Sequence, residues 1–302
     1  MKYLKPNSVK LFIKKLFKLH GASDYTIQTV SDGLILSSMR GVDSHGINLI
    51  PHYLDCLING RKNGNPNFSI SSKYPSSILL NADHAFGLTA GDKAISLAMK
   101  CADKYGISQI GVLNSSHCGS LASTALKAAK KNYCIFAFTN ADALVNTFNA
   151  SNSFFGTNPI CFSSPSHIKN KPFCLDMSQS NISWNKLLNH KQNNEMLDDY
   201  FAVDHLGNST NNPNRAKGLL PIGGYKGYGL ASMVDILCGV ILKNNFGSML
   251  IPMYNTDLSI RRKIGQHYIV FKTDCFMSTQ NFKKRMRDMY KLLQLHSIPK
   301  KK

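Results

Sequence analysis

Two histidines stand beside glycines in short polar stretches, where an imidazole is free to exchange a proton. His45 belongs to Asp43-Ser44-His45-Gly46, and His117 belongs to Asn114-Ser115-Ser116-His117-Cys118-Gly119. Imidazole changes charge near neutral pH, so either side chain is suited to general acid–base chemistry. We expect His45 at a helix N-terminus and His117 at the end of a strand, the place where ligands gather in α/β proteins. The alternative at both positions is a capping, surface or core histidine.

A glycine-rich stretch and a hydroxyl-rich stretch indicate a site for an anion or a ribose. In Leu220–Gly229, four glycines in seven residues would let backbone N–H groups approach an anion, and Lys226 supplies a positive charge. This stretch matches neither the P-loop nor the G-x-G-x-x-G pattern. Asp176-Met177-Ser178-Gln179-Ser180 follows an apolar run and could hold a phosphate or ribose. The alternatives are a structural glycine turn and an Asx-type turn.

The elements that position these residues alternate between helix and strand. Apolar spacing predicts helices over 8–21, 23–39, 47–60, 87–104, 120–131 and 278–295, and one after residue 229. It predicts strands over 77–80, 107–113, 134–139, 160–163, 173–175, 201–203 and 267–271, and loops through most of 189–214. The last helix should turn Phe282, Met289 and Leu293 inward. The fold class is therefore α/β or α+β.

Composition limits the classes of partner and location. The chain has 302 residues and a formal net charge of +19, but its basic residues are scattered and form no nucleic-acid-binding motif. The eight cysteines form no Cys-x-x-Cys pair and indicate free thiols in a reducing compartment, with no metal site. We find no signal peptide and no apolar run long enough to span a bilayer. The expected location is the cytoplasm, with no nucleic-acid or membrane partner.

Several of these stretches together resemble one known family. The segments are DSHG (43–46), NSSHCG (114–119), FGTNPICF (155–162), LDMSQS (175–180), DHLGNSTNNP (204–213) and LLPIGGYKGYGLASMVDILCGVILK (219–243). In this order they are similar to the non-Rossmann malate/L-lactate dehydrogenase family, which includes ureidoglycolate and sulfolactate dehydrogenases and diketogulonate reductases. The resemblance extends from about residue 8 to about residue 295.

The resemblance implies an NAD- or NADP-dependent oxidoreductase of small 2-hydroxy and 2-oxo acids, acting as a homodimer. It implies a helical domain from both chain ends (1–75 with 220–302) beside a mixed-sheet cofactor domain (76–219). The implied catalytic residues are His45, His117 and Asp142, with one of the histidines as proton donor or acceptor. The implied cofactor-binding residues are Asp176, Met177, Ser178, Ser180, Lys226 and Asn158. The implied substrate-binding residues are Ser44, Tyr53 and Asn140.

The chain departs from the family pattern at three places. Leu49 stands where many relatives carry an arginine suited to a substrate carboxylate, and one helical turn should place it on the same face as His45. Arg40, Arg261 or Arg262 could replace that arginine. Asn185-Lys186 replaces Gly-Lys, and the sequence ends at Lys302, before a segment that contacts the cofactor in relatives. The alternative function is a catalytically weakened or silent, shortened relative that keeps the fold and dimerises.

Overall fold

A computed structural model describes residues 4–297 of the chain. Its helices and helical turns are α1 (Pro6–Leu19), α2 (Asp24–Met39), η1 (Asp43–His45), η2 (Ile47–Leu49), α3 (Ile50–Ile58), α4 (Gly87–Tyr105), α5 (Ala122–Lys130), α6 (Trp184–Asn193), α7 (Tyr225–Asp235), η3 (Ile236–Val240), η4 (Gly247–Met249) and α8 (Thr279–His296). Its strands are β1 (Ser69–Tyr74), β2 (Ser77–Asn81), β3 (Ile107–Ser115), β4 (Tyr133–Thr139), β5 (Val145–Asn146), β6 (Ser153–Phe155), β7 (Ile160–Ser164), β8 (Phe173–Met177), β9 (Ala202–Val203), β10 (Ser209–Thr210), β11 (Gly218–Leu219) and β12 (Ile264–Lys272).

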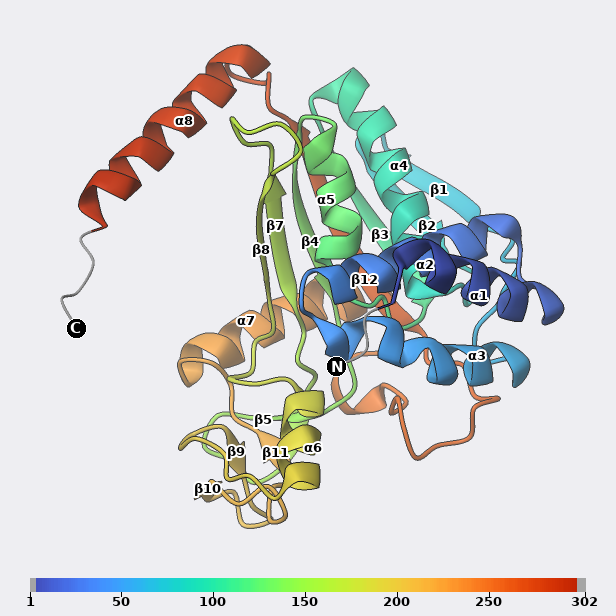
Figure 1. Cartoon of the computed structure of the whole chain (residues 1–302), viewed down its shortest axis with the longest axis vertical. Helices are drawn as coiled ribbons and strands as arrows, with labels where there is room; N and C mark the ends of the chain where they lie inside the picture. The colour runs from blue at the N-terminus through green and yellow to red at the C-terminus, as the bar shows by residue number, and fades with distance from the viewer. Residues whose placement is uncertain (1–3, 298–302) are drawn as a thin grey trace.

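Two mixed sheets organise these elements (Figure 1). The larger has seven strands in the order β1-β2-β3-β12-β4-β7-β8, and the smaller has five in the order β10-β9-β11-β5-β6. In the larger sheet only β2 and β3 are parallel, and β12 pairs antiparallel with both β3 and β4. The predicted α/β class with a mixed sheet is confirmed.

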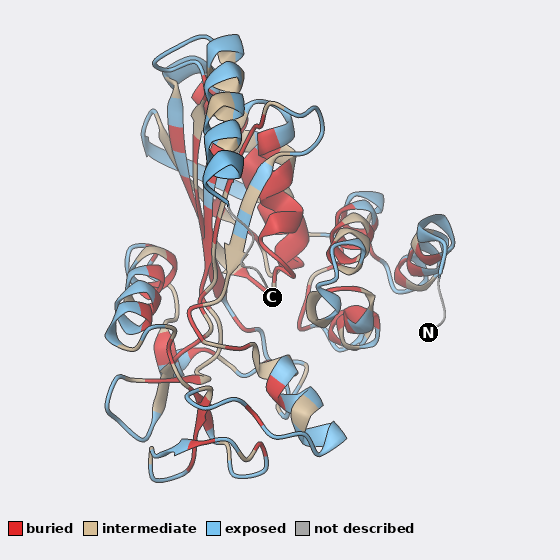
Figure 2. Cartoon of the chain, turned by 60° about the vertical axis from the view of Figure 1, so that its left-hand side comes forward, coloured by how far each residue is buried: buried red, intermediate tan, exposed pale blue. Residues whose placement is uncertain are grey.

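The large sheet is covered on both faces, as the period of two in its strands requires. On one face, Ile135 and Ala137 of β4 pack into a core with α4 and α5. On the other face, Phe138 packs against Val234 of α7 and Cys238 of η3. Figure 2 shows buried residues concentrated in these central strands and in the helix packed on them. The sheet is therefore a rigid support for the loops at its strand ends.

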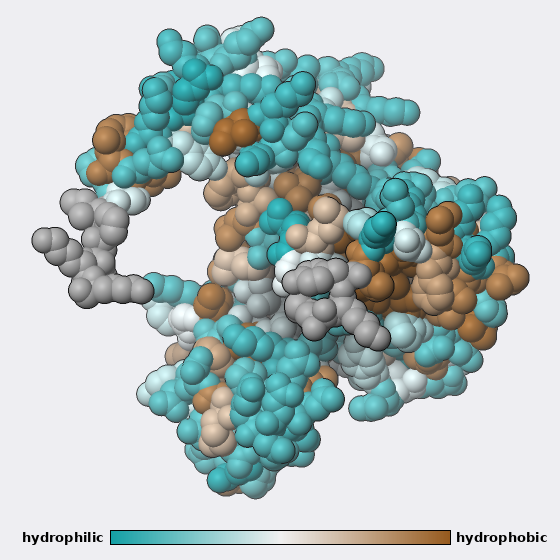
Figure 3. All heavy atoms as spheres, viewed as in Figure 1, coloured by the Kyte–Doolittle hydropathy of each residue, from teal (hydrophilic) through white to brown (hydrophobic). Residues whose placement is uncertain are grey.

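The N-terminal helices α1, α2 and α3 build a separate core at one side of the sheet. Ser23 begins α2 by accepting a hydrogen bond from the Thr26 N–H at 3.3 Å, as expected of an N-cap. Met253, from the C-terminal third, packs into the same core. Figure 3 shows apolar side chains gathered over α1–α3 at the right of the molecule. The division into 1–75 with 220–302 and 76–219 stays a prediction. Strand β12, which that division assigns to the helical domain, lies in the middle of the large sheet between β3 and β4.

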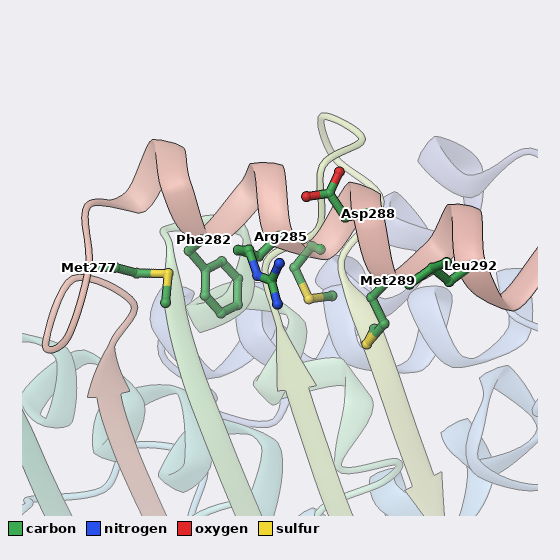
Figure 4. A pocket seen from close by; sticks show the side chains of 7 residues that line it. Met277, Phe282, Arg285, Asp288, Met289 and Leu292 are labelled. Carbon is green, nitrogen blue, oxygen red and sulfur yellow. The ribbon is translucent and has the colours of Figure 1, made fainter.

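Strands β1, β5, β6, β10 and β11 were not predicted from the sequence, and two predicted regions are placed differently. Residues 189–193, expected in a loop, form the end of α6, which Ser183 begins as N-cap. In α8 every residue is described and none is fully buried; Met289 and Leu293 are exposed, so the inward orientation predicted for them is wrong, and Phe282 is half-buried. Figure 1 shows this helix extending from the body. Figure 4 shows the apolar side chains along one side of it, here called the apolar row, among them Phe282, Met289 and Leu292. Helical periodicity identifies an apolar face but does not say what covers it.

Candidate functional site

His45 lies in the short polar connection between α2 and α3. It is the last residue of η1 and directly precedes Gly46, the N-cap of the helical run that begins at Ile47, so it lies at a helix N-terminus as predicted. Gly46 is required next to it, because a Cβ at that position would come within 2.1 Å of Ser38 Oγ. The same Ser38 hydroxyl accepts a hydrogen bond from the Ile47 N–H at 3.0 Å. This close approach of turn and helix fixes the backbone that carries His45.

His117 follows β3 and lies against His45. The two imidazole ring centroids are 5.4 Å apart with an interplanar angle of 28°, so the rings stack. Each Nδ1 has a hydroxyl partner, since Ser44 Oγ lies 2.9 Å from that of His45 and Tyr53 Oη lies 2.8 Å from that of His117. Residues that are far apart in the sequence are thus brought together as predicted.

Burial keeps both imidazoles in their neutral form. Burial lowers the pKa of His45, and burial followed by the nearby positive charges lowers the pKa of His117 well below its ordinary value. The Gly119 N–H donates to His117 Nδ1 at 3.4 Å, a contact that fits the tautomer with its proton on Nε2. A neutral imidazole at pH 7 is ready to accept a proton.

Two neighbouring cavities share the wall on which His45 lies. The larger, of about 440 Å³, is lined by polar side chains from several elements, among them Arg40, Ser44, His45, Ser120, Asp176 and Ser178. The smaller, of about 40 Å³, is lined by both histidines and by Asn140, Asp142 and Arg262. His45, Gly119, Thr157 and Pro159 line both cavities. A ligand in the larger cavity would therefore reach a second, small ligand held in the smaller cavity beside the histidine pair.

The small cavity has a buried ion pair in its wall. Asp142 pairs with the Arg262 guanidinium, and its second oxygen accepts a hydrogen bond from the Met253 N–H at 3.1 Å. Arg262 also donates from Nε to the Ile251 carbonyl at 2.7 Å. Arg61 and Lys62 are buried nearby, so positive charge exceeds negative charge around this cavity. Such an environment favours an anionic ligand.

The predicted cofactor loop and the glycine-rich turn lie side by side. Asp176, Met177 and Ser178 line the larger cavity, and Asp176 accepts a hydrogen bond from the Ala122 N–H of α5 at 2.8 Å. The Ile222 N–H donates to the Gln179 carbonyl at 2.9 Å, which joins turn and loop. Lys226 is exposed in the first turn of α7 and lines neither of the two cavities.

Four predicted site residues brace the structure around the cavities. Asn158 is fully buried, with Oδ1 accepting from the Ala141 N–H and Nδ2 donating to the Ala231 carbonyl, both at 3.0 Å. Asn140 lines the small cavity and donates to the Asn245 carbonyl at 3.0 Å. Ser180 donates to the Ile182 carbonyl at 2.7 Å, and Tyr53 supports His117 from behind. Their binding roles stay predictions.

Leu49 does not face the site. It is 4% exposed and packs in the core of α1–α3, so the prediction that it shares a face with His45 is wrong. The cause is the break between η1 and η2 at Gly46, which interrupts the helical spacing. Arg262, one of the suggested replacements, lines the small cavity. Sequence reasoning missed Thr157 and Pro159 as lining residues, although both lie in the FGTNPICF segment.

Two further features of residues 4–297 bear on the class of protein. No group of three His, Cys, Asp or Glu side chains in this range is placed to hold a metal ion. No helix in the same range is both long enough and apolar enough to cross a bilayer. The fold and site thus define a mixed-sheet α/β protein with a stacked histidine pair at a small cationic cavity, one histidine of which also lines a larger polar cavity.

The chain belongs to the malate/L-lactate dehydrogenase family, whose family model matches residues 4–301. Members of this family are oxidoreductases of hydroxy acids. Among curated relatives, ureidoglycolate dehydrogenase (NAD(+)) of Escherichia coli K12 is 31% identical over 258 residues, covering 85% of this chain and 73% of that protein. Malate dehydrogenase of Pyrococcus abyssi is 32% identical over 288 residues, covering 92% and 78%.

Solved structures agree with this membership. Sulfolactate dehydrogenase from Methanocaldococcus jannaschii superposes with a TM-score of 0.91 at 26% identity, covering 99% of this chain and 86% of that one. Malate dehydrogenase from Entamoeba histolytica superposes with a TM-score of 0.90 at 25% identity, covering 97% and 84%. The predicted family is therefore confirmed.

Proposed function

We propose that the chain is an NAD- or NADP-dependent oxidoreductase that interconverts a small 2-hydroxy acid and its 2-oxo acid. The observation that carries this proposal is the stacked His45–His117 pair beside both a long cleft and a small cavity. The names of the relatives, which act on malate, sulfolactate and ureidoglycolate, support the substrate class. One of these relatives is named for NAD(+), which supports the nicotinamide cofactor.

The residues of the larger cavity fit a nicotinamide dinucleotide. The Asp176 carboxylate and the Ser178 and Ser120 hydroxyls can bind ribose hydroxyls, and Arg40 can pair with a phosphate. The buried Gln179 side chain has no hydrogen-bond partner among residues 4–297, so its amide is available beside the loop. When bound, the cofactor supplies hydride transfer. We assign its binding to this cleft, with Met177 as an apolar contact and Lys226 at the rim.

The protein's own part in the reaction is to move the hydroxyl proton and orient the acid. A neutral His45 or His117 accepts the proton of the 2-hydroxyl during oxidation and returns it during reduction. Ser44 and Tyr53 hold the two rings through their Nδ1 atoms. Both histidines line the small cavity, and either one can be the proton carrier.

The small cavity selects a compact anion. Leu49 is buried away from it, so the carboxylate is not bound from that position. Arg262 faces the cavity while paired with Asp142, and Asn140 adds an amide. The excess of positive charge attracts the carboxylate, and the small volume excludes bulky acids.

The assembly of the histidines, the loop and the cationic cavity supports the enzyme over the alternative of a catalytically silent relative. The homodimer is part of the proposal. Exposed apolar side chains lie along the apolar row of α8 and on η3, where they include Ile236 and Val240. These surfaces can form the interface with a second copy of the chain. Sedimentation equilibrium of the full chain measures this assembly.

The test is an activity screen with histidine variants. Purified protein is titrated with NADH and NADPH by fluorescence and then assayed with malate, lactate, ureidoglycolate and oxo acids. Replacing the proton-carrying histidine, His45 or His117, by Ala should lower turnover by ~10²–10⁴-fold while cofactor binding is kept. The matched control is His205→Ala, which changes an exposed histidine. Wild-type-like turnover in both site variants would remove the histidine pair from the reaction.

A further inference from the structure

Lys62 is a buried lysine behind the histidine pair. Its side chain is 2% exposed, and its ammonium nitrogen has no hydrogen-bond partner among residues 4–297. That nitrogen lies 3.3 Å from the centroid of the Tyr53 ring and 5.1 Å from the centroid of the Phe86 ring. An unpaired buried cation is costly, and two aromatic faces recover only part of the lost hydration. Such a residue requires an explanation.

The backbone holds Lys62 in this position. Helix α3 ends at Ile58, and Gly60 in the turn that follows adopts the left-handed conformation with φ at +79°. The Lys62 N–H then donates to the Cys56 carbonyl at 3.0 Å, and the Asn63 N–H donates to the His84 carbonyl at 2.8 Å. The neighbouring Arg61 side chain donates to the Met253 carbonyl at 3.1 Å. These contacts direct the Lys62 side chain under the Tyr53 ring and away from solvent.

Tyr53 connects Lys62 to the site. One side of its ring meets the Lys62 ammonium, and its hydroxyl oxygen lies 2.8 Å from His117 Nδ1. Lys62 lines neither of the two cavities, so it has no contact with their contents. Lys62 can therefore act on His117 in two ways, by packing against Tyr53, which contacts the imidazole, and by the Coulomb interaction of its charge with the imidazole.

We propose that Lys62 is a positioning residue whose stem holds Tyr53 against the His117 imidazole and whose ammonium group acts on that imidazole across the Tyr53 ring. This proposal rests on the proposed function, which makes His117 a candidate proton carrier. Without the charge, the pKa of His117 would rise, while burial and His45 would still hold it below its ordinary value.

The surrounding charges are consistent with this role. The titratable and charged groups that face His117 are His45, His52, Tyr53, Lys62, Arg262 and Asp142. Those that face Lys62 are Cys56, Cys118, Arg61, Arg262 and Tyr53. Burial lowers the pKa of Lys62 to about 7, so the ammonium is present at acidic pH, where His117 would otherwise protonate. None of the groups facing Lys62 is a carboxylate.

The experiment compares Lys62→Met with wild type in the full chain. Methionine keeps an apolar stem under the Tyr53 ring and removes the charge. The control is Lys73→Met, which removes an exposed lysine over the Tyr74 ring, where the nitrogen-to-centroid distance is 5.6 Å. NMR titration of the His117 side chain reports its protonation without any need for activity. The pH profile of kcat/KM and the KM at the optimum are measured beside it.

We expect the His117 titration midpoint in Lys62→Met to move up by about one pH unit, the effect of losing a nearby like charge. The acid limb of kcat/KM should move in the same direction with KM unchanged, and Lys73→Met should match wild type. An unmoved His117 midpoint in a folded Lys62→Met protein overturns the proposal. A raised KM with an unmoved acid limb also overturns it, because Lys62 would then contact substrate.

Two further measurements keep the test decisive. If Lys62→Met does not fold, Lys62→Gln supplies the neutral variant, and Lys62→Arg should keep the wild-type titration. In wild type, a Lys62 amine that titrates near its ordinary pKa would by itself refute the buried placement. If wild type oxidises no 2-hydroxy acid, the proposed function fails, while the His117 midpoint still decides the role of Lys62.

Discussion

Replacing Asp142 by Asn should leave the Arg262 guanidinium buried without its counter-charge. The Arg262 side chain is 2% exposed and that of Asp142 is 15% exposed, so solvent screens the pair little. Removing one partner of a buried ion pair costs about 3–5 kcal/mol. The same substitution also disturbs the acceptor of the Met253 N–H. We expect a fall in Tm of roughly 6–15 °C for a chain of this size.

A double-mutant cycle separates the ion pair from the rest of the effect. Asp142→Asn combined with Arg262→Met removes both charges and should recover most of the lost stability. The matched control is Asp24→Asn, which breaks the exposed Lys18–Asp24 pair and should leave Tm unchanged. Thermal and urea unfolding followed by circular dichroism are measured for wild type, Asp142→Asn, Arg262→Met, the double variant and the control, five proteins in all. If Asp142→Asn is as stable as the control, the pair does not hold this wall, and the Asp142 carboxylate is free to act on substrate.

Three further outcomes follow from packing and charge. Leu49→Arg should destabilise the fold by at least about 3 kcal/mol in urea unfolding, because position 49 faces an apolar core. For the same reason it should not lower the KM for malate. A folded variant with a lower KM would show that position 49 faces the substrate instead. Gly227→Ala should weaken NADH binding about tenfold by fluorescence titration, since its Cβ would come within 2.4 Å of the Ile222 carbonyl oxygen, while Gly229→Ala has open space and should bind as wild type. The pKa of Lys62 is lowered to about 7 from an ordinary value of 10.5, so its cost is complete below pH 7 and is relieved as pH rises toward 10.5. The stability of wild type relative to Lys62→Met should therefore rise by up to about 5 kcal/mol over that range, and a difference independent of pH would contradict the burial of the charge.

Local patterns predicted the buried central strands. The predicted strands at 77–80 and 134–139 are within a residue of β2 and β4, because both are short apolar runs between turn residues. The two histidines were found because each lies in a polar motif that resembles the family. Their contact required the fold, since β3 and α3 bring together residues that are far apart in the sequence.

The remaining features depend on which surfaces meet. The apolar row of α8 has helical spacing, but residues 4–297 bury none of its side chains fully and leave Met289 and Leu293 exposed, and spacing contains no information about partners. Leu49 was misplaced because Gly46 breaks the helix between it and His45. No local signal distinguishes Lys62 from a surface lysine, because its burial comes from Tyr53, Phe86 and the turn after α3.

The position of β12 has a consequence for synthesis on the ribosome. This strand joins two half-sheets, β1-β2-β3 and β4-β7-β8, yet it emerges roughly 125 residues after β4. At a translation rate of about 5–20 residues per second, the inner edges of β3 and β4 wait unpaired for roughly 6–25 s. Unpaired apolar strand edges bind other chains readily, so the nascent protein passes through an aggregation-prone interval that ends when β12 inserts. A chaperone that shields these two edges would act during that interval, and its benefit should grow as translation slows.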